Sequence, residues 1–178
     1  MGTFTRGTVA GSHKAFKYNK DYSLGVRQHL VKHFASEQGW LMSGEANPGS
    51  YHSELLRSQM CIAPAGWELW SVRLFESILL GCIPVILSDD LHLPFQSQID
   101  YSQFTIKVPH ASLSQLPEIL GAVSDETIRR KQASLKTFWK AVTYQTPPAP
   151  GDAWEHLLHE LQARVHHNLR GTPFGFWT

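Results

Sequence analysis

Polar residues that could bind a charged ligand lie within a short apolar stretch, residues 64–86 (PAGWELWSVRLFESILLGCIPVI). Arg73 carries a fork of hydrogen-bond donors that suits a diphosphate. Glu76, three residues further on, has a carboxylate that only accepts hydrogen bonds, which suits the paired hydroxyl groups of a ribose. Ser71 adds a hydroxyl nearby. A charge in so apolar a segment needs a partner, a helix end or a ligand, so we interpret this stretch as a candidate nucleotide site.

The elements expected around this stretch place the candidate residues at the end of a strand. MCIA (60–63) is typical of a short buried strand, Pro64-Ala65-Gly66 predicts a tight turn, and the spacing of apolar residues predicts a helix over about 69–80 with Gly81 as its C-cap. In open parallel sheets, ligands bind beyond the carboxyl ends of the strands, where the free N–H groups of a following helix attract phosphate.

A simpler interpretation is that Arg73 and Glu76 pair with each other on a helix surface. Such a pair at i, i+3 contributes only a few tenths of a kcal/mol. The expected helix, however, is apolar on nearly all sides and leaves little solvated face. A largely buried helix that keeps two charges favours the ligand interpretation.

Composition excludes several classes of protein. The chain of 178 residues is long enough for one sizeable domain, and its hydrophobic share of 42% and charged share of 17% indicate a folded globule. A net charge of +1 with no basic run longer than RRK (129–131) gives no case for nucleic acid or acidic membranes. No signal peptide is visible in the polar first twenty residues, and the longest apolar run, about 78–87, is too short to span a bilayer.

The rest of the chain predicts an α/β domain followed by helices. We expect a strand within 3–11, a helix from Ser23 as N-cap to Gly39, a helix over 50–59, and strands over 83–88 and 101–108. IPVIL lacks polar alternation, as expected for a parallel strand covered on both faces. This order indicates a Rossmann-like three-layer domain with a mostly parallel sheet, followed by C-terminal helices over 113–123 and 125–144.

Domain boundaries follow from a proline-rich segment. We expect an α/β domain over 1–145, a linker over 146–152, and a C-terminal helix and tail over 153–178. The last helix has an apolar stripe that we expect to cover another surface. Its residues are Trp154, Leu157, Leu158, Leu161, Val165 and Leu169.

Cysteine and histidine give weaker signals. Cys61 and Cys82 could pair with each other, although two small buried side chains are the favoured interpretation, and their redox state stays open. His29 and His33 lie at i, i+4 on an expected helix and could face one ion, but no third ligand is evident. We therefore predict no metal site.

A longer pattern resembles a known family. YHSELLRSQMCIAPAG followed by SVRLFESILLGCIPVILSDDLHLPF is similar to the C-terminal half of the exostosin-like glycosyltransferases, and YSLGVRQHL resembles their Gly-x-Arg helix, which places Arg27 at a matching position. The resemblance covers roughly residues 3–145. The other matching positions are Tyr51, Leu55, Ser58, Cys61, Pro64, Gly66, Ser71, Arg73, Glu76, Gly81, Cys82, Pro84, Val85, Ser88, Asp89, Leu93, Pro94 and Phe95.

The resemblance implies a fold and a reaction. It implies the C-terminal half of a GT-B fold, which binds a nucleotide sugar, here a UDP-sugar as donor substrate with no cofactor, for an inverting transfer to a glycan or polysaccharide acceptor. Glu76 would hold the ribose, Arg27 and Arg73 the diphosphate, and Glu68 the region of the sugar. Gly66 and Ser71 complete the implied donor site. Trp67 and Trp70 depart from the family pattern beside Glu68.

The same resemblance implies parts that we do not recognise in this sequence. The general base is expected in an N-terminal GT-B half, so no catalytic residue is assigned here, and the family implies a Golgi membrane location on the lumenal side. We expect the chain to be a fragment, the product of an incomplete gene model or a reduced homologue. Alternatives are a non-catalytic remnant that binds a partner or lacks the acceptor half, and an unrelated nucleotide-binding α/β domain. The donor sugar, the acceptor and the oligomeric state stay open.

Overall fold

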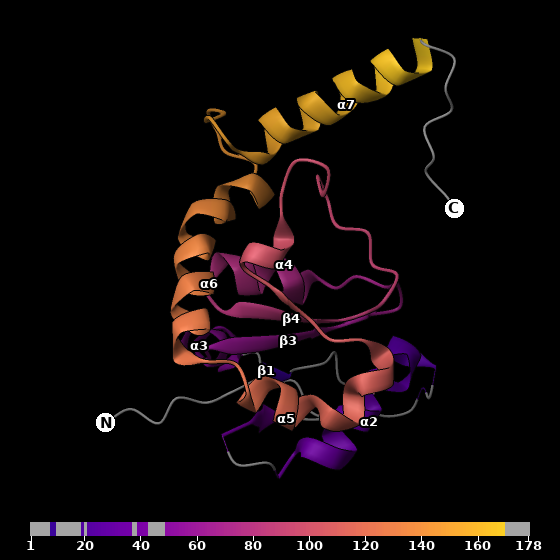
Figure 1. Cartoon of the computed structure of the whole chain (residues 1–178), viewed down its shortest axis with the longest axis vertical. Coiled ribbons are helices and arrows are strands. Elements are labelled where there is room, and N and C mark those ends of the chain that lie inside the picture. Colours follow the sequence, from indigo (N-terminus) through magenta and orange to yellow (C-terminus); the bar gives the residue numbers. More distant parts are fainter. Residues whose placement is uncertain (1–7, 10–18, 20, 37–38, 43–48, 170–178) are drawn as a thin grey trace. The chain divides into compact units, whose positions relative to one another are not determined.

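Figure 1 shows the chain as a computed structural model, which describes residues 8–9, 19, 21–36, 39–42 and 49–169. The expected strand within 3–11 appears as β1 (Thr8–Val9), which pairs in parallel with β2 (Leu41–Met42). The other residues of the segment 3–11 lie outside the described part of the chain.

A parallel sheet forms the centre of the α/β unit. Its strands are β3 (Met60–Pro64), β4 (Ile83–Leu87) and β5 (Ile106–Lys107), in the order β3-β4-β5. The register pairs Met60 with Ile83 and Pro64 with Leu87, so the carboxyl ends of β3 and β4 lie at the same edge. Every residue of these two strands is buried, which explains their lack of polar alternation. The predicted Rossmann-like α/β fold class is confirmed.

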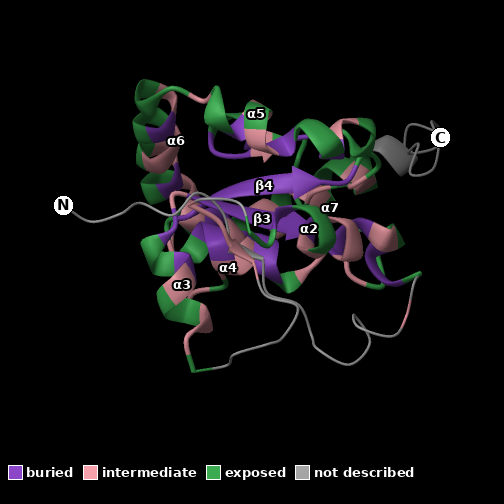
Figure 2. Cartoon of the chain, turned by 90° about the horizontal axis from the view of Figure 1, so that it is seen from below, coloured by how far each residue is buried: buried purple, intermediate pink, exposed green. Residues whose placement is uncertain are grey.

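Helices cover both sides of this sheet. In Figures 1 and 2, α4 (Val72–Leu79) and α5 (Leu116–Gly121) lie on opposite sides of β3 and β4, and Figure 2 shows the two strands as buried. The other helices described are α2 (Val26–Phe34), α3 (Tyr51–Arg57), α6 (Asp125–Phe138) and α7 (Ala153–Leu169). Short 3₁₀ turns occupy Tyr22–Gly25, Tyr101–Gln103, His110–Gln115 and Trp139–Val142.

The start predicted for the helix after β3 is wrong. Residues 67–70 form a loop, and α4 begins only after Ser71, which has extended backbone angles (φ −146°, ψ 151°). The loop closes because the Gly66 N–H donates to the carbonyls of Glu68 (2.9 Å) and Trp70 (3.3 Å). Gly81, predicted to end the helix, follows the C-cap and has a positive φ of 74°, which glycine adopts without strain.

Two other expectations also require correction. Ser23 does not cap a helix: it lies in a 3₁₀ turn with φ 59°, its neighbour Leu24 has φ 52°, and α2 begins after Gly25. The segment 101–108 is mostly not a strand, since a 3₁₀ turn precedes the two residues of β5.

By backbone contacts the chain divides into two units. One comprises Met1–Leu91 and Tyr101–Lys136, and the other His92–Asp100 and Thr137–Thr178. In the second unit, α7 bonds to the segment before Asp100 through Gln98 and His156, and it leaves an apolar stripe exposed. The exposed residues of this stripe are Trp154, Leu158, Leu161 and Val165. Among the described residues, no helix is both long and apolar enough to cross a bilayer.

Candidate functional site

The turn after β3 is held in place by residues at the start of α2. The Arg27 side chain donates from Nε to the carbonyl of Ala65 (3.1 Å) and from Nη2 to that of Pro64 (3.5 Å). The N–H of Ser23 donates to the carbonyl of Gly66 (3.0 Å). These bonds fix the first residues of α2 against the carboxyl end of β3, where parallel sheets bind their ligands.

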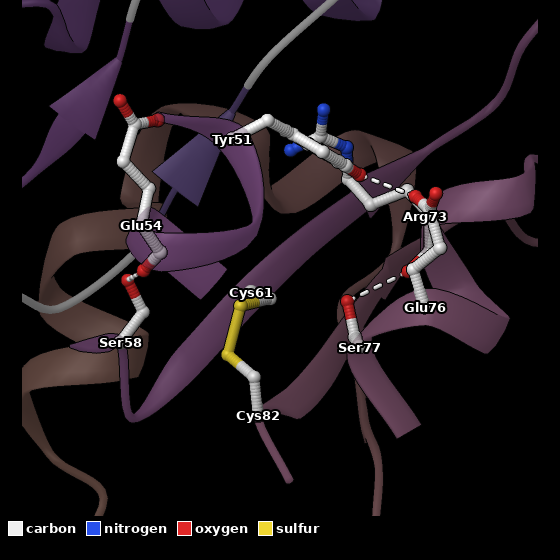
Figure 3. The surroundings of a disulfide bond; sticks show 8 residues. All are labelled: Tyr51, Glu54, Ser58, Cys61, Arg73, Glu76, Ser77 and Cys82. Carbon is white, nitrogen blue, oxygen red and sulfur yellow. Dashed lines mark hydrogen bonds between the residues drawn. A yellow bond between two sulfur atoms is a disulfide. The ribbon is translucent and has the colours of Figure 1, made fainter. Parts of the chain in front are cut away.

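Three side chains from two helices form the polar centre of the candidate site. The Arg73 guanidinium on α4 lies over the ring of Tyr51, the first residue of α3, with its Cζ 4.8 Å from the ring centroid. The Tyr51 hydroxyl donates to Oε2 of Glu76, which is one turn further along α4 than Arg73. Figure 3 shows the ring between the guanidinium and the carboxylate. We call Tyr51, Arg73 and Glu76 the polar triad.

Burial shapes the charges of this site. Arg73 is 6% exposed and Arg27 4% exposed. The pKa of Arg73 is lowered to about 10, mainly by burial and also by the nearby Arg27 charge, whereas Tyr51 and Glu76 act in the opposite direction. Burial also lowers the pKa of Arg27. Arginine stays cationic near neutral pH, and the Arg27 charge lies near enough to lower the pKa of Arg73. Two buried positive charges near each other favour an anion.

The remaining predicted residues surround the turn. Ser71 lies at the N-cap of α4, and its hydroxyl oxygen is buried without a hydrogen-bond partner among the described residues. A Cβ added to Gly66 would meet the Trp70 carbonyl oxygen at 3.2 Å, so only glycine fits without a shift. Glu68 is exposed on the loop, between the exposed Trp67 and Trp70. The structure therefore gathers Arg27, Gly66 and the polar triad, with Glu68 at the outer edge.

Sequence reasoning missed the role of Tyr51. The motif contains this tyrosine, but a separation of 25 residues from Glu76 gives no signal that the two side chains meet. Burial raises the pKa of the Tyr51 hydroxyl to about 12, and its bond to Glu76 acts in the same direction. The hydroxyl therefore stays protonated and donates to Glu76 throughout the physiological range of pH.

The favoured interpretation of the cysteines was wrong. Cys61 on β3 and Cys82 just before β4 form a disulfide, with their Cα atoms 5.8 Å apart. Both are fully buried in a cluster with Leu55, against which Tyr51 packs. Of the polar triad, Tyr51 therefore packs against the cluster that contains the disulfide, and Figure 3 shows the triad and the disulfide in one view.

No candidate metal site accompanies these residues. Within the described part of the chain, no group of three or more histidine, cysteine, aspartate or glutamate residues could hold an ion. His29 and His33 do meet, with ring centroids 4.4 Å apart.

Fold and site together define a class of protein: a parallel α/β domain with a cationic site at the carboxyl end of a buried strand, against the start of a helix. The sequence narrows this class, because residues 5–123 match the Exostosin GT47 domain. The chain belongs to the exostosin GT47 family, as the motif predicted.

Three similar relatives are plant proteins. The chain is 34% identical over 146 residues to a "probable glucuronoxylan glucuronosyltransferase" of Arabidopsis thaliana, in a match that covers 81% of the chain and 31% of the relative. It is 32% identical over 149 residues to the "probable beta-1,4-xylosyltransferase IRX10" of the same species, covering 83% and 36%. It is 32% identical over 148 residues to the "probable glucuronosyltransferase GUT1" of Oryza sativa subsp. japonica, covering 82% and 35%. The chain spans about a third of the length of these curated relatives.

Proposed function

We propose that this chain is the donor-binding part of a glycosyltransferase and binds a UDP-sugar for an inverting transfer to a glycan or polysaccharide acceptor. The observation that carries the proposal is the polar triad. A buried guanidinium and a half-buried carboxylate lie one helical turn apart, and one tyrosine contacts both. The two groups match the two polar parts of a nucleoside diphosphate, its phosphates and its ribose hydroxyl groups.

Each residue has a role in this proposal. Glu76 accepts hydrogen bonds from the ribose, and Arg73 and Arg27, with the first N–H groups of α4, bind the diphosphate. An acceptor hydroxyl attacks the anomeric carbon, loses its proton to a general base, and the bond from that carbon to the diphosphate oxygen breaks. The positive charges then stabilise the negative charge that develops on the departing UDP. Ser71 and the Gly66 turn border the diphosphate, and Glu68 borders the sugar.

The acceptor and the general base belong, in this proposal, to a facing half of a GT-B fold. The relatives are about three times as long as the region that matches this chain, which leaves room in them for such a half. The exposed apolar stripe of α7 is a surface that the facing half would cover. The names of the relatives make glucuronic acid and xylose the first donor sugars to test.

We propose that the protein is located at the Golgi membrane, on its lumenal side, as the family resemblance implies. The buried disulfide supports an oxidising compartment, because such bonds persist in secretory compartments and are rare in the cytosol.

Thermal unfolding in the presence of a nucleotide panel tests the proposal. A ligand at about 100 times its Kd stabilises the folded state by about 2.7 kcal/mol, which raises Tm by about 5–10 °C for a chain of this size. We expect UDP to give such a shift and GDP and ADP to give smaller ones. Equal shifts with all three would indicate unspecific anion binding, and no shift with UDP would favour a remnant without a donor site.

A further inference from the structure

Tyr51 reaches the candidate site from a different element than the two residues that it contacts. Arg73 and Glu76 both lie on α4, whereas Tyr51 begins α3. Its ring face supports the Arg73 guanidinium, and its hydroxyl donates to one carboxylate oxygen of Glu76. One side chain thus restrains two groups whose proposed ligand contacts are different.

The two contacts act on different parts of a nucleotide. A guanidinium on an aromatic face loses much of its rotational freedom and remains cationic. A carboxylate has about four acceptor positions, so a tyrosine hydroxyl on Oε2 fixes the orientation of Glu76 and leaves acceptor capacity on Oε1. The ring of Tyr51 therefore affects the binding of the diphosphate through Arg73, and its hydroxyl affects the binding of the ribose through Glu76.

The support of Tyr51 itself is rigid. Its ring packs against the cluster of Leu55 and the Cys61–Cys82 disulfide, which links β3 to the start of β4. An aromatic side chain that packs against a buried disulfide has little freedom to move. Tyr51 can therefore hold Arg73 and Glu76 in fixed orientations.

We propose that Tyr51 is the positioning residue of the nucleotide site: its ring orients Arg73 toward the diphosphate and its hydroxyl orients Glu76 toward the ribose. This inference rests on the proposed function. It assigns Tyr51 no contact with the reacting atoms.

Two variants separate the ring from the hydroxyl. Tyr51→Phe keeps the ring and its packing and removes the hydroxyl, whereas Tyr51→Leu removes both. Calorimetric titration with UDP measures the affinity for the whole nucleotide, and titration with uridine measures the affinity for the nucleoside without its phosphates. Tyr144→Phe is the matched control, because Tyr144 is exposed in the other unit and keeps its ring contact with Trp154.

We expect Tyr51→Phe to weaken UDP and uridine by the same factor, about 3–10-fold, since one hydrogen bond to a charged group is lost. Tyr51→Leu should weaken UDP by about another 3–10-fold with little further loss for uridine, because the guanidinium loses its aromatic support. A merely structural role would lower both affinities together in Tyr51→Leu and leave their ratio unchanged, which would overturn the role of the ring.

A double-mutant cycle tests whether the hydroxyl acts through Glu76. Combining Tyr51→Phe with Glu76→Gln should cost no more uridine affinity than Glu76→Gln alone, whereas additive losses would overturn the assignment. If the wild-type chain binds UDP but Tyr51→Phe changes neither affinity, the positioning role fails and the proposed function stands. If the folded wild-type chain binds no UDP, both fail.

Discussion

Glu76 lies half-buried on α4, with one carboxylate oxygen bonded to Tyr51. Replacing it by alanine removes the proposed acceptor for the ribose. We expect Glu76→Ala to weaken UDP binding by about 1–3 kcal/mol, the usual cost of losing hydrogen bonds to a charged group, and to weaken uridine by a similar amount. Calorimetry of both ligands measures this change, with the exposed Glu118→Ala as control. Unchanged affinity would remove Glu76 from the site.

Arg73 makes a different prediction because its proposed ligand is the diphosphate. Arg73→Ala should weaken UDP more than uridine, since uridine carries no phosphate for the guanidinium to bind. The exposed Arg130→Ala removes the same charge elsewhere and should change neither affinity. Equal losses of UDP and uridine in Arg73→Ala would indicate that Arg73 only supports the fold.

The Tyr51 hydroxyl predicts a pH dependence of stability. Its pKa rises from 10.0 to about 12 in the folded chain, so the folded state keeps a proton that the unfolded state loses. The resulting stabilisation is complete below pH 10 and is lost as the pH rises through 12. Rapid urea unfolding at pH 9 and pH 11 should therefore show a larger loss of stability in the wild type than in Tyr51→Phe. Equal losses would contradict the raised pKa.

At the residue scale, the sequence could name candidates but not their contacts. Arg73 and Glu76 were recognisable because charges in an apolar stretch require an explanation. Tyr51 was not recognisable as part of the site, because tyrosine is common in cores. Only the folded chain brings its hydroxyl to Glu76. Arg27 was assigned to the diphosphate, and the structure adds bonds to the turn after β3 that spacing could not reveal.

The β3–α4–β4 unit is the element that positions the site. Its two parallel strands are fully buried, and the disulfide joins them across a separation of 21 residues. The disulfide lies near the amino ends of these strands, whereas the turn and the start of α4 follow the carboxyl end of β3.

The disulfide predicts a measurable part of the stability. A crosslink that closes a loop of this length stabilises the folded state by about 3 kcal/mol, mainly by restricting the unfolded chain. We expect the double variant Cys61→Ala/Cys82→Ala to lower the free energy of unfolding by at least that amount, because it also empties part of a buried cluster. Urea unfolding measures this difference.

A thiol count provides the control for that experiment. The chain has two cysteines, and both are in the disulfide, so the unfolded but unreduced chain should show no free thiol. Two free thiols, or a stability change well below about 1 kcal/mol in the double variant, would contradict the crosslink.

At the element scale, the buried strands were predictable and the irregular segments were not. MCIA and IPVIL are apolar without alternation, which few structures other than a covered parallel strand produce. Two residues of the loop 67–70, Leu69 and Trp70, were predicted as helix because they fit an apolar spacing, yet both lie exposed. The hydrogen bonds that the Gly66 N–H donates close this loop, and hydrophobic periodicity carries no information about such bonds.

For the whole molecule, the family assignment rests on a motif that is spread along the chain. The family model covers residues 5–123, so it includes the candidate site and ends before α6 and α7. The disulfide was left open because two cysteines without a recognisable spacing do not reveal whether they meet. Only the parallel register of β3 and β4 brings Cys61 and Cys82 together.

The most direct test of the central claim is calorimetric titration of the purified, oxidised chain with UDP, with uridine as the control ligand. The proposed donor site predicts saturable binding of UDP at one site per chain, tighter than that of uridine because the diphosphate contributes. Absence of UDP binding by a chain shown to be folded would contradict the claim that the polar triad forms a nucleotide site.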